Sequence, residues 1–218
     1  MKYGKLFISF MMGASLLTLP SCDGIFEDIY DTPQKSQFGF TEIATSEKIG
    51  TIFVNASEYT RWIYMDFHHS TIDSLTIVNG GEEYTGEWDL AVHRWETKTN
   101  DGSAIETEFT DLNAFLSAAK MPEGKYVEDI ETDSTIILDM SHMMEGEIVY
   151  AKGKINPLLS TWVNRDMSSM PPIYSMNNKV FVVKLKDGTS AALQLSNYMN
   201  DKYEKGFLTI KYVYPLAF

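Results

Sequence analysis

Methionine gathers in two short polar segments of the chain. Twelve methionines are present, and six of them fall within residues 140–176. Five of these six stand in segments 139–146 and 166–172, whose Asp, Ser, Gly and Pro residues predict loops: Met140, Met143, Met144, Met167 and Met170. Two such loops could supply thioether sulfurs to a soft metal centre, either haem iron from both faces or Cu(I). The alternative is that these methionines serve as adaptable packing.

The four histidines have different settings. His142 lies inside the first methionine segment, where a neutral imidazole could ligate iron or copper. His93 falls in a strand-like run at 88–94 and is predicted to be a packed strand residue. His68 and His69 follow another strand-like run and are predicted to be exposed. Only His142 is therefore kept as a reserve ligand.

Catalytic signatures are absent from the sequence. It contains no G-x-S-x-G, no H-E-x-x-H, no phosphate-binding glycine loop and no cysteine nucleophile within the predicted domain. Acidic residues are abundant, but spacing alone singles out no glycosidase pair. The formal net charge of -12 argues against nucleic acid, whose binding rests on Lys and Arg. We therefore predict a binding protein that is not an enzyme.

The N-terminus has the three parts of a secretory signal. Lys2 and Lys5 precede an uncharged apolar run at 6–18, and Leu-Pro-Ser-Cys follows at 19–22. The apolar run is shorter than the roughly 20 residues that span a bilayer, so it predicts a signal peptide rather than a membrane helix. Segment 19–22 resembles the lipobox of bacterial lipoproteins. Residues 1–21 are thus predicted to be removed, leaving a lipid on Cys22.

A short tether is predicted between the lipid and the domain. Cys22 is the only cysteine, so its lipidation leaves no disulfide, redox thiol or cysteine metal site. Residues 22–40 are predicted to be a lipid-anchored acidic tether and residues 41–218 one domain. The acidic stretch resembles the surface-export signals of Bacteroidota lipoproteins, which implies the cell-surface side of the outer membrane.

The elements that must position the loops are mostly strands. Short β-branched and aromatic runs separated by turn residues predict an all-β fold of antiparallel strands and hairpins. Asp187-Gly188 predicts a two-residue type I′ hairpin, and residues 208–214 alternate as a half-buried strand. One short helix is predicted at 111–119, with Thr110 or Asp111 as N-cap. The predicted strands are 51–56, 62–67, 75–78, 88–93, 135–138, 147–151, 180–186, 191–195 and 207–214.

Four segments in order resemble the HmuY-like haem-binding lipoproteins of Bacteroidota. They are residues 56–64, 87–94 with 98–100, 172–183 followed by Asp187-Gly188, and 206–215. The resemblance implies an all-β fold and a haemophore role, in which haem is taken from host haemoproteins and passed to a TonB-dependent outer-membrane receptor.

The resemblance also implies where the haem ligands lie. Two histidines, one from each of two loops, hold the iron in the best-known family member, and the second position aligns with Met167. The first falls in segment 139–146 and matches a group: Met140, His142, Met143 or Met144. Met140 with Met167 is the preferred axial pair, and Met143 with Met170 keeps the same spacing. Tyr174 and Trp162 are expected to cover the porphyrin faces.

Two other functions remain open. The first is a haem-free surface lipoprotein that binds glycan or protein. The second is capture of Cu(I) by Met140, Met143 and Met144 without a porphyrin.

Overall fold

A computed structural model of the chain describes residues 38–41, 48–78, 82–166, 168 and 172–218. These residues belong to one compact unit that spans 34–218. The predicted signal peptide, Cys22 and most of the predicted tether lie outside the described residues. Among the residues that are described, no helix is long and apolar enough to cross a membrane.

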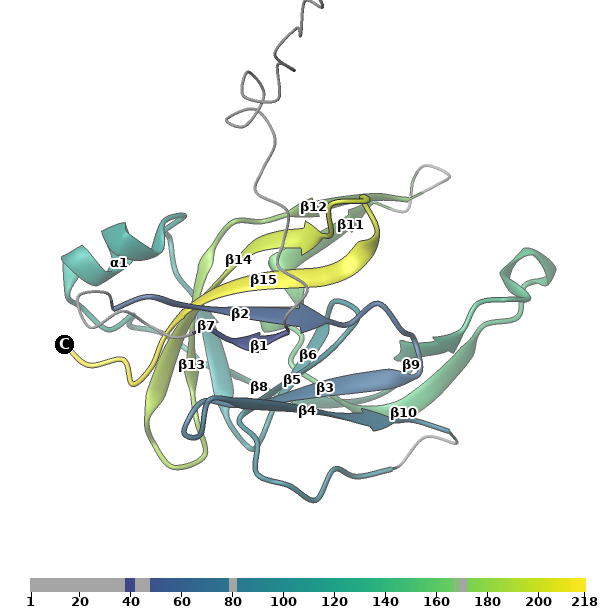
Figure 1. Cartoon of the computed structure of the whole chain (residues 1–218), viewed down its shortest axis with the longest axis horizontal. Helices are drawn as coiled ribbons and strands as arrows, with labels where there is room; N and C mark the ends of the chain where they lie inside the picture. Colours follow the sequence, from purple (N-terminus) through teal and green to yellow (C-terminus); the bar gives the residue numbers. More distant parts are fainter. Residues whose placement is uncertain (1–37, 42–47, 79–81, 167, 169–171) are drawn as a thin grey trace, which may run out of the picture. The chain divides into compact units, whose positions relative to one another are not determined.

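Antiparallel strands and one short α-helix make up the fold of the described residues, which confirms the predicted fold class (Figure 1). The larger sheet has seven strands in the order β1-β2-β15-β14-β13-β7-β8. Their bounds are β1 Gly39–Phe40, β2 Gly50–Asn55, β7 Ser103–Glu106, β8 Val127–Glu128, β13 Val180–Lys184, β14 Ser190–Met199 and β15 Lys205–Val213. The smaller sheet has four strands in the order β4-β3-β5-β6: β3 Arg61–Asp66, β4 Thr71–Thr76, β5 Leu90–His93 and β6 Glu96–Thr99.

The main hydrophobic core lies between the two sheets. Ile52 and Leu208 come from the larger sheet, and Met65 and Val92 come from the smaller one; all four are buried in one cluster. Each fully buried side chain of this size contributes roughly 1.5–3 kcal/mol. Figure 1 shows β2 and β15 above β3 and β4, as this core requires.

Strand β15 follows the predicted alternation over most of its length. Leu208, Ile210 and Tyr212 are buried in the main core, whereas Thr209 and Lys211 face outward. Val213 was expected on the outward face and is instead 8% exposed. It packs in a second cluster on the other side of the sheet, so both faces are covered at this end.

Helix α1 (Leu112–Ala118) covers that outer face. Asp111 is the N-cap, because its carboxylate accepts a hydrogen bond from the backbone N–H of Ala114. Leu112 and Phe115 are buried against Val180 and Val182 of β13. The helix is confirmed, and the choice between two caps is resolved to Asp111.

Two hairpins leave the sheets and run toward the same end of the molecule (Figure 1). The first joins β9 (Ile130–Asp139) to β10 (Val149–Ile155), and the second joins β11 (Val163–Asp166) to β12 (Ile173–Met176). A short 3-10 turn, η2 (Leu159–Trp162), connects β10 to β11. The base of β9–β10 packs on the outer face of the smaller sheet, where Ile136 and Ala151 join Trp62 in a third cluster.

The hairpin at Asp187-Gly188 forms, but its predicted turn type is wrong. Leu185 N donates to Thr189 O at 2.9 Å, and Gly188 N donates to Leu185 O at 3.0 Å. Three residues therefore form the loop, and Gly188 alone adopts a positive φ, of 89°, where a type I′ turn needs two such residues.

Candidate functional site

The turn between β9 and β10 carries the first methionine segment. Asp139 ends β9, and its carboxylate accepts hydrogen bonds from Ser141 N at 2.8 Å and Ser141 Oγ at 3.1 Å; these bonds lower the pKa of Asp139. A 3-10 turn, η1 (Met143–Glu145), follows and ends at Gly146, whose φ is 85°. The sequence thus folds locally into a tight projecting loop, as predicted for this segment.

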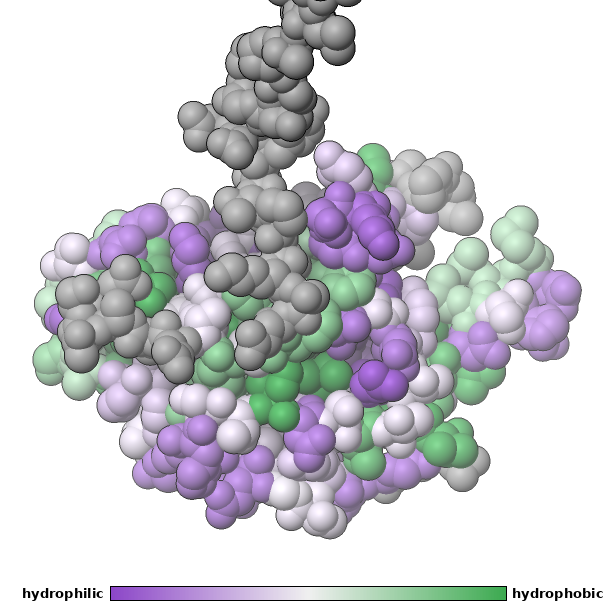
Figure 2. All heavy atoms as spheres, viewed as in Figure 1, coloured by the Kyte–Doolittle hydropathy of each residue, from purple (hydrophilic) through white to green (hydrophobic). Residues whose placement is uncertain are grey.

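The predicted ligands of this loop differ in their exposure to solvent. Met140 and Met143 are half-buried, and Met144 is 88% exposed. His142 is exposed, and its Nδ1 lies 2.9 Å from Glu145 Oε2. Its Nε2 has no hydrogen-bond partner within the described part of the chain, so this nitrogen is free to bind a metal. Figure 2 shows hydrophobic and hydrophilic side chains mixed at this projecting tip.

The second methionine segment joins β11 to β12. Asp166 ends β11 and accepts a hydrogen bond from Ser168 N at 2.9 Å. Met167 and Met170 lie outside the described residues. The described strands of the two hairpins, β9–β10 and β11–β12, run toward one end of the fold, and the pairing of Met140 with Met167 stays a prediction.

Tyr174 of β12 pairs with Arg165 of β11 and lies in a group of aromatic and cationic side chains. Its half-buried ring stacks on Tyr198 with centroids 6.0 Å apart and lies 5.7 Å from Trp95. Burial raises the pKa of Tyr174. Lys205 Nζ lies 3.9 Å from the Tyr174 centroid, and the Arg165 guanidinium lies 4.4 Å from that of Trp95.

These cations were not predicted from the sequence. Within the described residues, neither Arg165 nor Lys205 has a carboxylate at ion-pair distance. Arg165 directly precedes the second methionine segment, which was a usable signal. Lys205 begins β15, and nothing in the sequence pattern relates it to Tyr174.

Trp162 was predicted to cover a porphyrin face, but its side chain is buried. Its side chain is 0% exposed, and its indole N–H donates to the backbone oxygen of Trp95 at 2.9 Å. In this structure it belongs to the core between the sheets and offers no face to a ligand. Trp162 therefore packs in the core where the β11–β12 hairpin begins, and Tyr174 is the more exposed of the two aromatic residues.

The remaining histidines occupy the predicted environments. His93 is fully buried, with Nε2 2.6 Å from Tyr59 O and Nδ1 3.3 Å from Glu96 Oε2, which confirms a packed role. His68 and His69 are exposed as predicted. Both histidines also pair with acidic residues, which the sequence did not predict. His68 contacts Asp89 and Asp187, and His69 Nδ1 lies 2.6 Å from Asp66 Oδ2.

Comparisons with known proteins agree on one family. A family model described as HmuY protein matches residues 58–212. A Bacteroides vulgatus protein, provisionally described as an HmuY-like haem-binding protein, is 48% identical with a TM-score of 0.78, and the match covers 84% of this chain and 100% of that one. The resemblance expected from the four sequence segments is confirmed.

Two further solved structures are similar. A Bacteroides fragilis protein, provisionally described as a lipoprotein, is 42% identical with a TM-score of 0.79, covering 85% of this chain and 99% of that chain. The apo form of an HmuY analogue from Tannerella forsythia is 27% identical with a TM-score of 0.64, covering 74% and 93%. No curated protein matches the chain.

Proposed function

Because the chain belongs to the HmuY family, we propose that it is a haem-binding protein that captures haem and releases it chemically unchanged. One observation carries the proposal: the β9–β10 turn presents Met140, Met143 and His142 at the end of the fold toward which β11–β12 also runs. Thioether sulfur and imidazole nitrogen are both established donors to haem iron.

The donors present fit a haem. His142 has a free Nε2, and Met140 and Met143 are held in a turn fixed by Asp139 and Gly146. We propose Met140 and Met167 as the axial pair, with Met143 and Met170 next and with His142 and Met144 in reserve. A haem held this way would supply an iron centre stabilised in the ferrous state, because soft thioethers favour Fe(II) over Fe(III).

The side chains around Tyr174 fit the rest of a haem. Arg165 and Lys205 are cations without a carboxylate partner in the described chain, so they can pair with the negatively charged propionates. Tyr174 offers a half-buried ring to the porphyrin face. These residues would orient the haem and exclude water from one side of it.

The wider role proposed is that of a surface haemophore. A lipid on Cys22 would hold the domain at the outer membrane, facing outward. There it would take haem from host haemoproteins and pass it to a TonB-dependent receptor. The description of the Bacteroides fragilis relative as a lipoprotein supports the anchor.

The direct test is titration of haemin into the chain without residues 1–22, followed by absorbance with and without dithionite. We expect a saturable one-to-one spectrum of six-coordinate low-spin haem, and tighter binding after reduction. Met140→Ala should weaken binding, whereas Met199→Ala on β14 is the matched control and should not. A spectrum that stays that of free haem in both redox states would exclude the proposal.

Copper is the second candidate, because three methionines and His142 share one turn. Competition with a Cu(I) chelator distinguishes the two functions. A haem protein should take up haem stoichiometrically while leaving copper on the chelator.

A further inference from the structure

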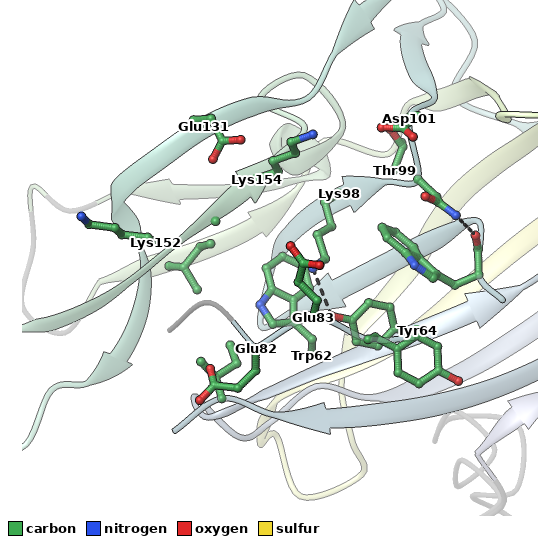
Figure 3. A pocket seen from close by; sticks show the side chains of 16 residues that line it. Trp62, Tyr64, Glu82, Glu83, Lys98, Thr99, Asp101, Glu131, Lys152 and Lys154 are labelled. Atoms are coloured by element: carbon green, nitrogen blue, oxygen red, sulfur yellow. Dashed lines mark hydrogen bonds between the residues drawn. The ribbon is translucent and has the colours of Figure 1, made fainter. Parts of the chain in front are cut away.

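A cavity of about 500 Å³ opens beside the smaller sheet, apart from the methionine turn. Its walls come from the outer face of β3 and β6, from the base of the β9–β10 hairpin and from residues before β5 that include Trp88 (Figure 3). No described residue of segments 139–146 or 163–176 lines it. Cavities of roughly 300–1,000 Å³ commonly hold small organic molecules.

Lys98 of β6 extends into this cavity (Figure 3). Its Nζ donates a hydrogen bond to Tyr64 Oη at 3.0 Å and lies 4.4 Å from the ring centroid of Trp62. The centroids of Tyr64 and Trp88 are 4.9 Å and 5.4 Å away. Three aromatic rings thus stabilise the ammonium by cation–π attraction.

In the described part of the chain, the Lys98 ammonium has more hydrogen-bond donors than acceptors. An ammonium has three N–H donors, and Tyr64 accepts only one of them. Within the described chain no carboxylate lies at ion-pair distance from Lys98. Burial lowers the pKa of Lys98 to about 8, although Asp129 and Glu83 act in the opposite direction. Charges removed from water are normally paired, so this cation is unusual.

Apolar surface lies next to the ammonium. Trp88 is half-buried, and the buried Ile136 and Ile77 complete an apolar wall. The acids that also line the cavity include Glu83 and Glu131, which are exposed and therefore screened by water and salt. Their negative charge disfavours a dianion such as phosphate more than a monoanion.

We propose that this cavity binds a small organic monocarboxylate. The carboxylate accepts hydrogen bonds from the two free N–H groups of Lys98, and the apolar body of the ligand packs against Trp88 and Ile136. The site is independent of haem, because none of the proposed iron ligands lines the cavity.

The test uses benzoate as the probe and benzamide as a neutral molecule of the same shape. Each is titrated into the haem-free chain, and binding is followed by NMR of the tryptophan side chains. Benzoate should bind saturably and at least tenfold more tightly than benzamide, with shifts centred on Trp88 and Trp62. Equal affinity for the two probes, or no saturable shift with benzoate, would overturn the proposal.

The matched variants are Lys98→Met and Lys120→Met. Methionine keeps the length and apolar contacts of the lysine and removes its charge, so Lys98→Met should lose at least tenfold in benzoate affinity and leave benzamide unchanged. Lys120 is exposed, pairs with Glu123 and does not line the cavity, so Lys120→Met should bind benzoate like the parent chain. Undiminished benzoate binding by folded Lys98→Met would also overturn the site, and none of these outcomes depends on haem.

Discussion

At the scale of single residues, side-chain chemistry was more predictable than side-chain placement. The clustering of Met140 and Met143 in polar sequence located a projecting turn, because turn residues are recognisable without tertiary context. Trp162 was expected to cover a porphyrin face, and its side chain is buried in the core. Trp162 ends the 3-10 turn η2, and the local sequence does not determine which way a side chain points at such a position.

The two aromatic residues near the second hairpin should therefore behave differently. Trp162→Ala removes a fully buried ring and its hydrogen bond to Trp95, and should cost about 3–5 kcal/mol of unfolding free energy. Tyr174→Ala should cost less, because that ring is half-buried, and should weaken haem binding instead. Urea unfolding and haemin titration check the pair. Wild-type stability in Trp162→Ala would contradict a core role.

Lys98 should make stability depend on pH. Its pKa is about 8 in the folded chain against 10.5 when exposed, so the folded state is penalised while the ammonium is charged. Between pH 8 and pH 10.5 this lysine is protonated in the unfolded chain and largely neutral in the folded one. The free energy of unfolding therefore rises as the pH rises through this range. The gain is about 1–3 kcal/mol at most.

The Lys98→Met variant lacks this titration. We therefore expect the parent chain to gain stability relative to Lys98→Met as the pH rises from about 7.5 to about 10. Urea unfolding of both chains at each pH measures this change. Lys120→Met serves as the control, because that lysine is exposed. A pH-independent difference for Lys98→Met would mean that Lys98 titrates normally.

At the scale of elements, strands with apolar alternation were predicted and polar strands were missed. The short helix and the strands β2, β3, β13 and β15 follow from periodicity and caps. The sequence Glu-Thr-Lys-Thr of β6 has no apolar alternation, yet Glu96 and Thr97 are buried because the strand pairs with β5 inside the fold. Tertiary pairing overrides local preference there. For the same reason the role of Lys98 was not predicted, because its cavity forms only where the β9–β10 hairpin packs on the smaller sheet.

The two sheets are linked at one edge by His68. Its Nδ1 lies 3.1 Å from Asp89 Oδ2, and its Nε2 lies 2.9 Å from Asp187 Oδ2 in the β13–β14 turn. Imidazole donates from both nitrogens only when protonated, so the hydrogen bond to Asp187 and that to Asp89 raise the pKa of His68. This contribution to stability is fully present below the ordinary pKa of histidine and is lost as pH rises through the raised one.

Asp187→Asn tests the link between the sheets. It should lower the melting temperature more at acidic pH, where His68 is protonated, than at alkaline pH above the raised pKa of His68. The effect should be small and should shrink in salt, because both partners are exposed. Glu123→Gln, in an exposed pair with Lys120, should show no such pH dependence. An equal loss at both pH values would show that His68 carries no charge in this link.

At the scale of the whole molecule, two sheets share a core and two hairpins extend from them. The sheets share one core, α1 covers one outer face and the base of β9–β10 covers the other. Both hairpins run to one end, whereas His68 links the sheets elsewhere. Periodicity predicted the strands, but it contains no information on where hairpins point, since that depends on the packing of the sheets.

The proposed function requires that thioether sulfurs of this chain bind haem iron. The most direct measurement is proton NMR of the reduced, haem-loaded chain with labelled methionine methyl groups. A methyl group bonded to iron through its sulfur lies over the porphyrin ring, whose ring current shifts its resonance far upfield. We predict two such signals, one lost in Met140→Ala and the other in Met167→Ala. Methionine methyl signals that all remain at their haem-free positions in a chain with bound haem would contradict the account.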